Sequence, residues 1–320
     1  MQIQLLKVHG SGNTFYLYDT SYESEFDWVQ LTQWLCNPEN ENGADGLLLV
    51  LPSKSADAKM RVINADGSEA SMCGNGLRCV ARYVCEKNNL SEALIETMYA
   101  DLRVKQQQPI FGQLPTYAVE ISPVSFDLHT LPMRYEDKTV IYNEILPAFS
   151  PEIKFTAVSV PNPHLIGIVG QSLIEDPSHQ KAFASYLNGE NDYFPDGVNV
   201  SYVFPISQDE IFVRTYERGV GFTNACGTAM TASALISRKF KYVSTNKVTV
   251  YNPGGFVQCH VDEQNGQYNL SLIGNATEVS TYKMEINDGD LRFIDCVLTQ
   301  EQVQYEKCSN FVKHKLGNLI

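Results

Sequence analysis

Asn64-Ala-Asp-Gly-Ser-Glu-Ala-Ser-Met-Cys-Gly-Asn-Gly-Leu-Arg78 is the stretch of this sequence that decides its predicted fold. Cys73 is followed at once by Gly-Asn-Gly, and apolar residues then recur at helical spacing, so we expect the thiol at the first turn of a helix. Backbone N–H groups and the positive end of the helix dipole converge at such a position, where they bind carboxylates and favour thiolates. The stretch therefore predicts a reactive cysteine.

A second stretch repeats this arrangement: Tyr216-Glu-Arg-Gly-Val-Gly-Phe-Thr-Asn-Ala-Cys-Gly-Thr-Ala229. Cys73 and Cys226 each follow an alternating, strand-like segment and a glycine-rich turn. Asn64 and Glu217 precede their respective cysteines by the same number of residues. The sequence therefore predicts two similar halves, each with one cysteine at the start of a helix.

Two thiols placed in this way suit a reaction that inverts a carbon centre. Inversion needs a deprotonated group that removes a proton from one face of the carbon and a protonated group that returns one to the opposite face. The unperturbed pKa of cysteine is about 8.5, and a helix N-terminus or a polar neighbour can bring it closer to neutrality. The paired cysteines therefore predict a two-base racemase or epimerase.

Further motifs accompany the two cysteines between Met1 and about Thr277. They are His9-Gly-Ser-Gly-Asn-Thr-Phe15, Gly43-Ala-Asp-Gly46, Asn64-Ala-Asp-Gly-Ser-Glu69 with Cys73-Gly-Asn-Gly76, Asn162-Pro-His164, Gly197-Val-Asn-Val200, Glu217-Arg-Gly219 and Ala225-Cys-Gly-Thr228. In this order they resemble the motifs of the diaminopimelate epimerase family. Two residues depart from the family pattern: Phe222 stands where Glu is common, and Pro161 where Gly is frequent. Because Phe222 removes a charge near Cys226, we expect the pKa of that thiol to be tuned differently.

The resemblance implies an α/β (α+β) fold with two pseudo-symmetric domains. Each would be a strongly curved, mostly antiparallel sheet or barrel wrapped around a central helix, with the active site in the cleft between them. We expect residues 1–122 with about 275–320 to form the half that carries Cys73, and residues 123–274 the half that carries Cys226. The tail from Thr281 to Ile320 extends beyond the usual end of the family, and its lysines suggest a solvated end.

The function implied by the resemblance is the epimerisation of LL-2,6-diaminopimelate to meso-2,6-diaminopimelate, a precursor of lysine and peptidoglycan. The family works without a cofactor, and the sequence offers no convincing lysine or phosphate-binding loop for pyridoxal phosphate. Two alternatives stay open: a cofactor-independent racemase of another amino acid with the same fold, or an inactive protein that binds an amino acid.

The resemblance also assigns roles to individual residues. Cys73 and Cys226 would be catalytic, and His164 and Glu217 would tune their pKa values. A guanidinium grips a carboxylate at two points, and a carboxylate holds an ammonium group, which suits Arg218 and Glu217 to an amino-acid end of the substrate. The full set expected to bind substrate is Asn13, Asn64, Gly74, Asn75, Asn162, Asn199, Glu217, Arg218, Gly227 and Thr228.

Composition favours a soluble, cytoplasmic enzyme. The chain has 320 residues, of which 43% are hydrophobic, enough for two domains with cores of their own. Its net charge of −13 argues against nucleic-acid and anionic-membrane partners. Its start alternates like a strand, unlike a signal peptide, and no apolar run has the length of a membrane helix. The eight cysteines are therefore expected to be free thiols without a metal. Homodimer formation is left open.

Overall fold

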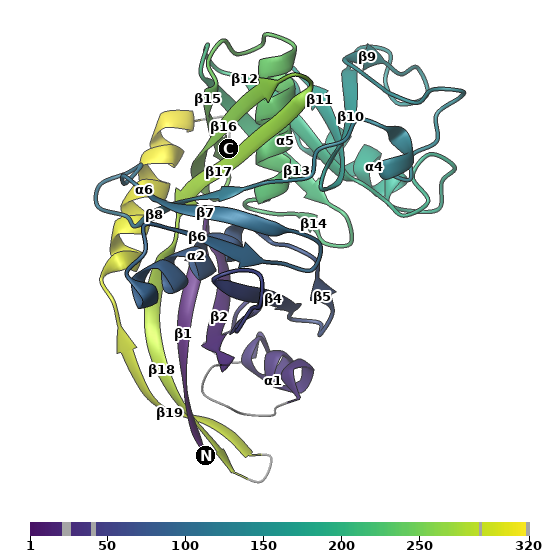
Figure 1. Ribbon diagram of the computed structural model, residues 1–320. Coiled ribbons are helices and arrows are strands. Elements are labelled where there is room, and N and C mark those ends of the chain that lie inside the picture. Colours follow the sequence, from purple (N-terminus) through teal and green to yellow (C-terminus); the bar gives the residue numbers. More distant parts are fainter. Residues whose placement is uncertain (21–26, 40–42, 288–289, 318–320) are drawn as a thin grey trace. The chain divides into compact units, whose positions relative to one another are not determined.

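The computed structural model describes residues 1–20, 27–39, 43–287 and 290–317, and the chain forms two units (Figure 1). Unit 1 comprises Met1–Val119 and Ile273–Cys308, and unit 2 comprises Glu120–Leu272 and Ser309–Ile320. Strands outnumber helices in both units. The sheet-dominated α+β class predicted from the sequence is therefore confirmed.

Unit 1 is built around the helix that Cys73 precedes. Its elements are β1 (Gln2–Gly10), β2 (Asn13–Asp19), α1 (Trp28–Leu35), β3 (Gly46–Leu51), β4 (Ala58–Asn64), β5 (Glu69–Ala70), α2 (Gly74–Asn88), β6 (Glu92–Glu96), β7 (Asp101–Gln107), β8 (Thr116–Glu120), β18 (Thr277–Asn287) and β19 (Asp290–Leu298). The helix α2 contacts β1, β2, β3, β4, β6 and β7 (Figure 1). Its predicted apolar face is buried, since Leu77, Val80 and Ala81 have no exposed surface.

Unit 2 is built in the same way around the helix that Cys226 precedes. Its elements are η2 (Leu128–Thr130), β9 (Glu144–Ile145), β10 (Lys154–Val160), β11 (Asn162–Ile168), α3 (Gln171–Glu175), α4 (Ser178–Leu187), β12 (Asn199–Pro205), β13 (Glu210–Glu217), β14 (Gly221–Phe222), α5 (Gly227–Lys239), β15 (Lys247–Asn252), β16 (Gly255–Gln264) and β17 (Gln267–Asn275), whose last residues belong to unit 1. The helix α5 contacts β10, β11, β12, β13, β15 and β16.

The two units repeat one order of strand pairing. In unit 1, β1 and β2 are antiparallel, β2 and β3 parallel, β3 and β4 antiparallel, β4 and β6 parallel, and β6 and β7 antiparallel. In unit 2 the strands β10, β11, β12, β13, β15 and β16 follow the same succession of directions. Each central helix comes after the fourth of these strands and a two-residue strand, β5 or β14. This repetition explains the two similar halves seen in the sequence.

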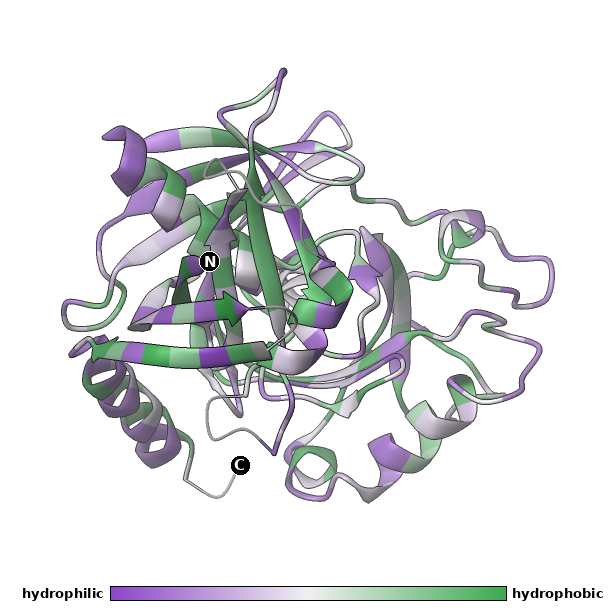
Figure 2. Cartoon of the chain, turned by 90° about the horizontal axis from the view of Figure 1, so that it is seen from below, coloured by the Kyte–Doolittle hydropathy of each residue, from purple (hydrophilic) through white to green (hydrophobic). Residues whose placement is uncertain are grey.

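The central strand β3 illustrates how the core of unit 1 forms. Leu47, Leu48 and Leu49 are completely buried. Leu47 and Leu49 belong to a cluster with Leu31 and Leu35 of α1, whereas Leu48 reaches Gly76 of α2. A strand covered on both faces reads as a continuous apolar run, and each buried leucine contributes about 1.5–3 kcal/mol. Such runs appear as green strands in Figure 2.

The tail corrects the expectation from the sequence. Instead of a solvated end, it contains most of β18, the strand β19, which pairs with β18, and the helix α6 (Glu301–Leu316). Cys308 and Val312 of α6 are buried, and residues from Ser309 onward belong to unit 2 rather than to the unit that carries Cys73. Spaced lysines had suggested solvent exposure, but one face of α6 is buried, with Tyr305, Cys308, Val312 and Leu316 at helical spacing.

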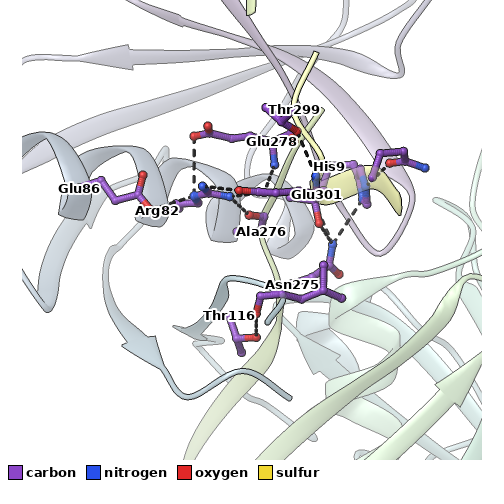
Figure 3. Close-up of polar contacts among 12 residues, drawn as sticks. His9, Arg82, Glu86, Thr116, Asn275, Ala276, Glu278, Thr299 and Glu301 are labelled. Atoms are coloured by element: carbon purple, nitrogen blue, oxygen red, sulfur yellow. Dashed lines mark hydrogen bonds and ion pairs between the residues drawn. The ribbon is translucent and has the colours of Figure 1, made fainter. Parts of the chain in front are cut away.

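An ion-pair cluster fixes the start of α6 within unit 1 (Figure 3). Arg82 of α2 donates to both carboxylate oxygens of Glu301, at 2.6 and 2.8 Å. It also donates to Glu86 at 2.9 Å and to the carbonyl of Ala276 at 2.8 Å, while Glu278 lies 3.7 Å away. A forked guanidinium held by several acceptors is a specific anchor. The start of α6 is therefore an integral part of unit 1.

Candidate active site

Cys73 occupies the N-cap position of α2, as predicted. Its backbone is extended, and its carbonyl accepts the first helical hydrogen bond, from Leu77 at 2.8 Å. The half-buried sulfur accepts an N–H from Gly76 at 3.4 Å and lies 3.6 Å from Oδ1 of Asn13, to which the thiol can donate. Cys73 thus has a donor suited to its thiolate and an acceptor suited to its thiol. It can exchange a proton without losing all of its polar contacts.

Cys226 occupies the matching N-cap position of α5. Its carbonyl accepts the first helical hydrogen bond, from Met230 at 2.9 Å, and its sulfur lies 3.6 Å from the hydroxyl of Thr228. The side chain is only 8% exposed. Burial raises the pKa of Cys226 well above its usual value, and the neighbouring carboxylate of Glu217 raises it further. In this state Cys226 is a protonated thiol.

The strand directions of unit 1 place the predicted polar residues at one edge of the sheet. Asn13 begins β2, and Asn64 ends β4. Because β2 runs parallel to β3, and β3 antiparallel to β4, the start of β2 and the end of β4 meet at the same edge. This edge is where the chain turns toward the N-terminus of α2. The side-chain amide of Asn64 donates to the hydroxyl of Ser68 at 3.0 Å, a contact within the turn that follows β4.

Asn13 is held in place from two sides. Its Nδ2 donates to Asp45 at 2.7 Å, and the same carboxylate oxygen accepts the N–H of Thr14 at 2.8 Å. Its Oδ1 faces Cys73 and also accepts from Nδ2 of Asn75, at 3.4 Å. The structure therefore brings Asn13, Cys73 and Asn75 together. The sequence motif contained Asp45 but gave it no role, and its contact with Asn13 assigns it one.

The same edge recurs in unit 2. Asn162 begins β11, Asn199 begins the parallel strand β12, and Glu217 ends the antiparallel strand β13. His164 pairs with Asn199 across the two strands. Asn199 accepts the backbone N–H of Arg218 at 2.9 Å, and Nη1 of Arg218 donates to the carbonyl of Asp196 at 3.0 Å. Arg218 keeps an exposed guanidinium at this edge.

Glu217 has a partner that the sequence did not suggest. The hydroxyl of Thr223 donates to Glu217 Oε1, and this carboxylate also interacts with Cys226. Thr223 follows β14, which pairs with the end of β13, so a short hairpin holds the carboxylate near the thiol. Phe222, the residue that departs from the family pattern, packs against Tyr216 with ring centroids 5.2 Å apart. Only the pairing of β13 with β14 brings the hydroxyl of Thr223 to the carboxylate of Glu217.

His164 is a buried, neutral imidazole. It has no exposed surface, and neither ring nitrogen has a hydrogen-bond partner among the residues that the structure describes. Burial lowers its pKa from 6.5 to about 3, and the charge of Arg218 adds to the effect. A charged imidazolium would lose its hydration in this place, and it would face a cation. His164 therefore carries no charge near neutral pH.

We expect this histidine to make unit 2 sensitive to acid. The unfolded state takes up the proton near pH 6.5, whereas the folded state does so only near pH 3. Stability is thus lost as pH falls from about 6.5 toward 3, at up to about 1.4 kcal/mol per pH unit. Urea unfolding of unit 2, followed between about pH 7 and pH 5, should show this slope. His164→Gln should flatten it.

The matched control is His260→Gln, because His260 is exposed in the same unit. Its replacement leaves the buried imidazole of His164 in place, so we expect the slope that His164 causes to remain. Equal slopes for the wild type and His164→Gln would contradict the burial argument.

Comparison with known proteins decides the family. The sequence profile described as Diaminopimelate epimerase matches residues 5–109 and 156–279. A diaminopimelate epimerase of Listeria innocua is 48% identical, over 98% of this chain and 98% of its own. One from Enterococcus faecalis is 47% identical, over 96% of this chain and 98% of its own. The chain belongs to the diaminopimelate epimerase family.

Solved structures with low sequence identity share the fold of this diaminopimelate epimerase family member. A phenazine biosynthesis protein of the PhzF family from Bacillus anthracis has a TM-score of 0.65 at 14% identity, over 89% of this chain and all of that one. A hydroxyproline epimerase from Agrobacterium vitis has a TM-score of 0.57 at 16% identity, over 88% of this chain and 92% of that one. These likenesses agree with the fold expected for the family.

Two features are absent from the part of the chain that the structure describes. No helix there is long and apolar enough to cross a membrane. Within the same residues, no three His, Cys, Asp or Glu side chains are grouped to hold a metal ion. In each unit, the N-cap cysteine and the polar residues at the nearby sheet edge are the candidate site residues.

Proposed function

We propose that this protein is an isomerase that converts LL-2,6-diaminopimelate to meso-2,6-diaminopimelate without a cofactor. The observation that carries the proposal is the identity of 46–48% to curated diaminopimelate epimerases over nearly the whole chain. The N-cap cysteines of α2 and α5 supply the two acid–base groups that such a reaction needs. The product would serve as a precursor of lysine and peptidoglycan.

In this proposal Cys73 and Cys226 act on opposite faces of one α-carbon. Cys226 retains its proton because it is buried beside Glu217, so it is suited to donate. Cys73 accepts the N–H of Gly76, a contact that favours a thiolate able to remove a proton. After one turnover Cys73 carries a proton and Cys226 does not. The two groups therefore exchange roles in the reverse reaction.

Backbone amides would stabilise the charge that develops as the proton leaves. Gly74 and Asn75 begin α2, while Gly227 and Thr228 begin α5, and the first N–H groups of a helix point toward a ligand at its N-terminus. Fixed dipoles aimed at the reacting carboxylate need no reorganisation during the reaction. These amides would supply the electrostatic stabilisation that a cofactor provides in other racemases.

The non-reacting amino-acid end would be bound by the two sheet edges. Arg218 offers an exposed guanidinium for the carboxylate, and Glu217 a carboxylate for the ammonium. The amides of Asn13, Asn64, Asn162 and Asn199 would fix the orientation of this end. The contact of Asn13 Oδ1 with the sulfur of Cys73, at 3.6 Å, supports a role for Asn13 close to the reacting carbon.

An assay with purified protein tests the substrate. The protein is incubated with LL-2,6-diaminopimelate, and chiral chromatography follows the appearance of the meso isomer. Parallel incubations contain L-proline and L-histidine. Formation of meso-diaminopimelate with both other amino acids unchanged supports the proposal. Inversion of proline or histidine, with diaminopimelate unchanged, would instead identify another racemase.

Solvent deuterium tests the proton-transfer scheme. When turnover takes place in D₂O, we expect the product to carry deuterium at the inverted carbon, because one thiol takes the substrate proton and the other delivers a solvent-derived one. Mass spectrometry of the meso product should show this single label. Product formed with full retention of the original hydrogen would rule out the two-base scheme.

A cytoplasmic location stays a prediction from the sequence, whereas the formation of a homodimer was left open there. Size-exclusion chromatography with light scattering would test the dimer.

A further inference from the structure

The helix α6 contacts the turn formed by Ser11 and Gly12, which directly precedes Asn13. The ring of Tyr305 packs edge-on against the ring of His9, with centroids 4.4 Å apart. Gln302 Oε1 lies 3.0 Å from Nε2 of His9. Glycine at position 12 leaves room for the Tyr305 hydroxyl, which would lie 3.3 Å from an added Cβ.

The contacts of His9 fix which ring nitrogen carries the proton. Nδ1 lies 3.2 Å from the backbone N of Gly12 and accepts its hydrogen. Nδ1 must therefore be unprotonated, and the proton of the neutral ring lies on Nε2. Nε2 then donates to Gln302 Oε1. Gln302 thus stabilises the one tautomer of His9 that can hold the turn.

The turn needs such support because its backbone is strained. Ser11 and Gly12 link β1 to β2 with φ angles of 55° and 80°, and a left-handed serine is unfavourable by roughly 1 kcal/mol. Asn275 accepts the Ser11 N–H at 2.9 Å, and Arg78 donates to the Ser11 hydroxyl at 2.9 Å. Asn13 comes directly after this turn. Its distance from Cys73 therefore depends on the turn.

A close contact transmits any shift of the turn to the first residues of α2. A Cβ added at Gly10 would lie 2.7 Å from the carbonyl oxygen of Asn75 and 2.8 Å from Nη2 of Arg78. The turn and α2 are thus in direct contact with no room between them. Movement of the His9 ring would change the position of Asn13, of the start of α2, or of both.

We propose that Gln302 and Tyr305 of α6 are positioning residues that hold His9, and through it the turn, so that Asn13 stays in contact with Cys73. This inference rests on the proposed function, since it gives the C-terminal helix a role in placing a catalytic thiol and its partner. Neither residue touches Cys73. Their effect passes through the His9 ring and the backbone of Ser11 and Gly12.

The charges that face His9 suggest how to test this role. Arg78 of α2 lowers the pKa of His9, Glu301 of α6 raises it, and burial dominates, bringing the value from 6.5 to about 4. Tyr305 and Gln302 add no charge near neutrality. A carboxylate in place of the Gln302 amide would raise the pKa by about 1–3 units. A protonated ring would carry hydrogen on Nδ1 and could no longer accept from Gly12.

The test compares the pH profiles of kcat/KM with LL-2,6-diaminopimelate for the wild type, Gln302→Glu and Gln304→Glu. Gln304→Glu is the matched control, because two positions along a helix turn the side chain by about 200°. Between about pH 8 and pH 5 we expect Gln302→Glu to lose at least about twofold more activity than the other two, because the raised pKa of His9 leaves half of its rings or more protonated at the lower pH. Its melting temperature at about pH 8 should lie only slightly below that of Gln304→Glu, because the substitution replaces a donor to Glu306, at 3.3 Å, with a like charge.

Each outcome has a defined meaning. A steeper acid limb in Gln302→Glu alone supports the proposal. Identical profiles for the two variants would overturn it, and so would a uniform loss without a change in the pH profile, because that would indicate packing alone. Wild-type activity separates this question from the proposed function. If the wild type leaves diaminopimelate unchanged, the function itself fails. If it is active and Gln302→Glu follows the control, only the role of α6 fails.

Discussion

Cys73→Ala and Cys226→Ala should each reduce epimerisation by roughly 1,000-fold or more, because a positioned acid or base contributes about 100- to 10,000-fold and each face of the carbon needs its own group. Each cysteine begins a helix that is the centre of its unit. Alanine keeps the helix and its amides and removes only the proton-carrying sulfur. The measurement is kcat/KM in both directions, from LL to meso and from meso to LL.

Matched controls separate the lost thiol from general damage. Cys296→Ala removes an exposed cysteine in unit 1, and Cys259→Ala removes a buried one in unit 2. Both should stay within a few-fold of the wild type, since they lie outside the N-cap positions. Near-normal interconversion by Cys73→Ala or Cys226→Ala would contradict the two-thiol assignment. A single variant with full activity suffices to reject it.

Arg82→Met should destabilise unit 1 by about 3–5 kcal/mol, the usual loss when one partner of a buried ion pair is removed. Arg82 is 8% exposed, and its guanidinium holds the carboxylates of Glu86, Glu278 and Glu301 together. Without it, Glu278 and Glu301, whose side chains are only about one-quarter exposed, would lose their cation. Burial already raises the pKa of Glu278, and Arg82 opposes that rise.

Tryptophan fluorescence provides the measurement, because Trp28 and Trp34 are the two tryptophans of the chain and both lie in unit 1. Urea unfolding followed by this signal reports the free energy of unfolding of that unit. Arg61→Met is the matched control. Its pair with Glu69 is about one-third exposed on each side, and such pairs are worth about 0–1 kcal/mol. A loss no larger than that of the control would show that the cluster contributes little.

A second substitution tests the cause of the Arg82 effect. Adding Glu301→Gln to Arg82→Met removes one of the uncompensated charges, so part of the lost stability should return. In the wild-type background Glu301→Gln should destabilise instead, because it weakens the forked contact with Arg82. Opposite signs in the two backgrounds would identify charge as the cause. Destabilisation in both would point to packing.

Local features of the site could be predicted from the sequence. The Cys-Gly pairs, with glycine-rich turns before them and apolar helical spacing after them, predicted Cys73 and Cys226 at helix N-termini, and both are N-cap residues. The duplicated spacing of Asn64 and Glu217 predicted two similar halves, and the order of strand pairing repeats accordingly. These features depend on residues close together in the chain, whose relative positions the backbone geometry of strands and helices largely sets.

Other features came from contacts between residues far apart in the sequence. The sequence contains Asn13 and Cys73, but only the pairing of β1 through β4 around α2 brings Oδ1 of one within 3.6 Å of the sulfur of the other. Thr223 reached Glu217 through the short hairpin of β13 and β14. The lysines of the tail suggested solvent, yet Glu301 and Tyr305 pack against Arg82 and His9.

The sequence by itself determined the local pattern of this protein: two cysteines, each at the N-terminus of a helix, in two copies of one arrangement. The tertiary structure decided which groups surround each thiol, the charge state of His164 and the contact of α6 with the turn before Asn13. The physical reason is that local pattern depends on covalent spacing, whereas burial and long-range hydrogen bonds exist only after the sheets have formed around α2 and α5.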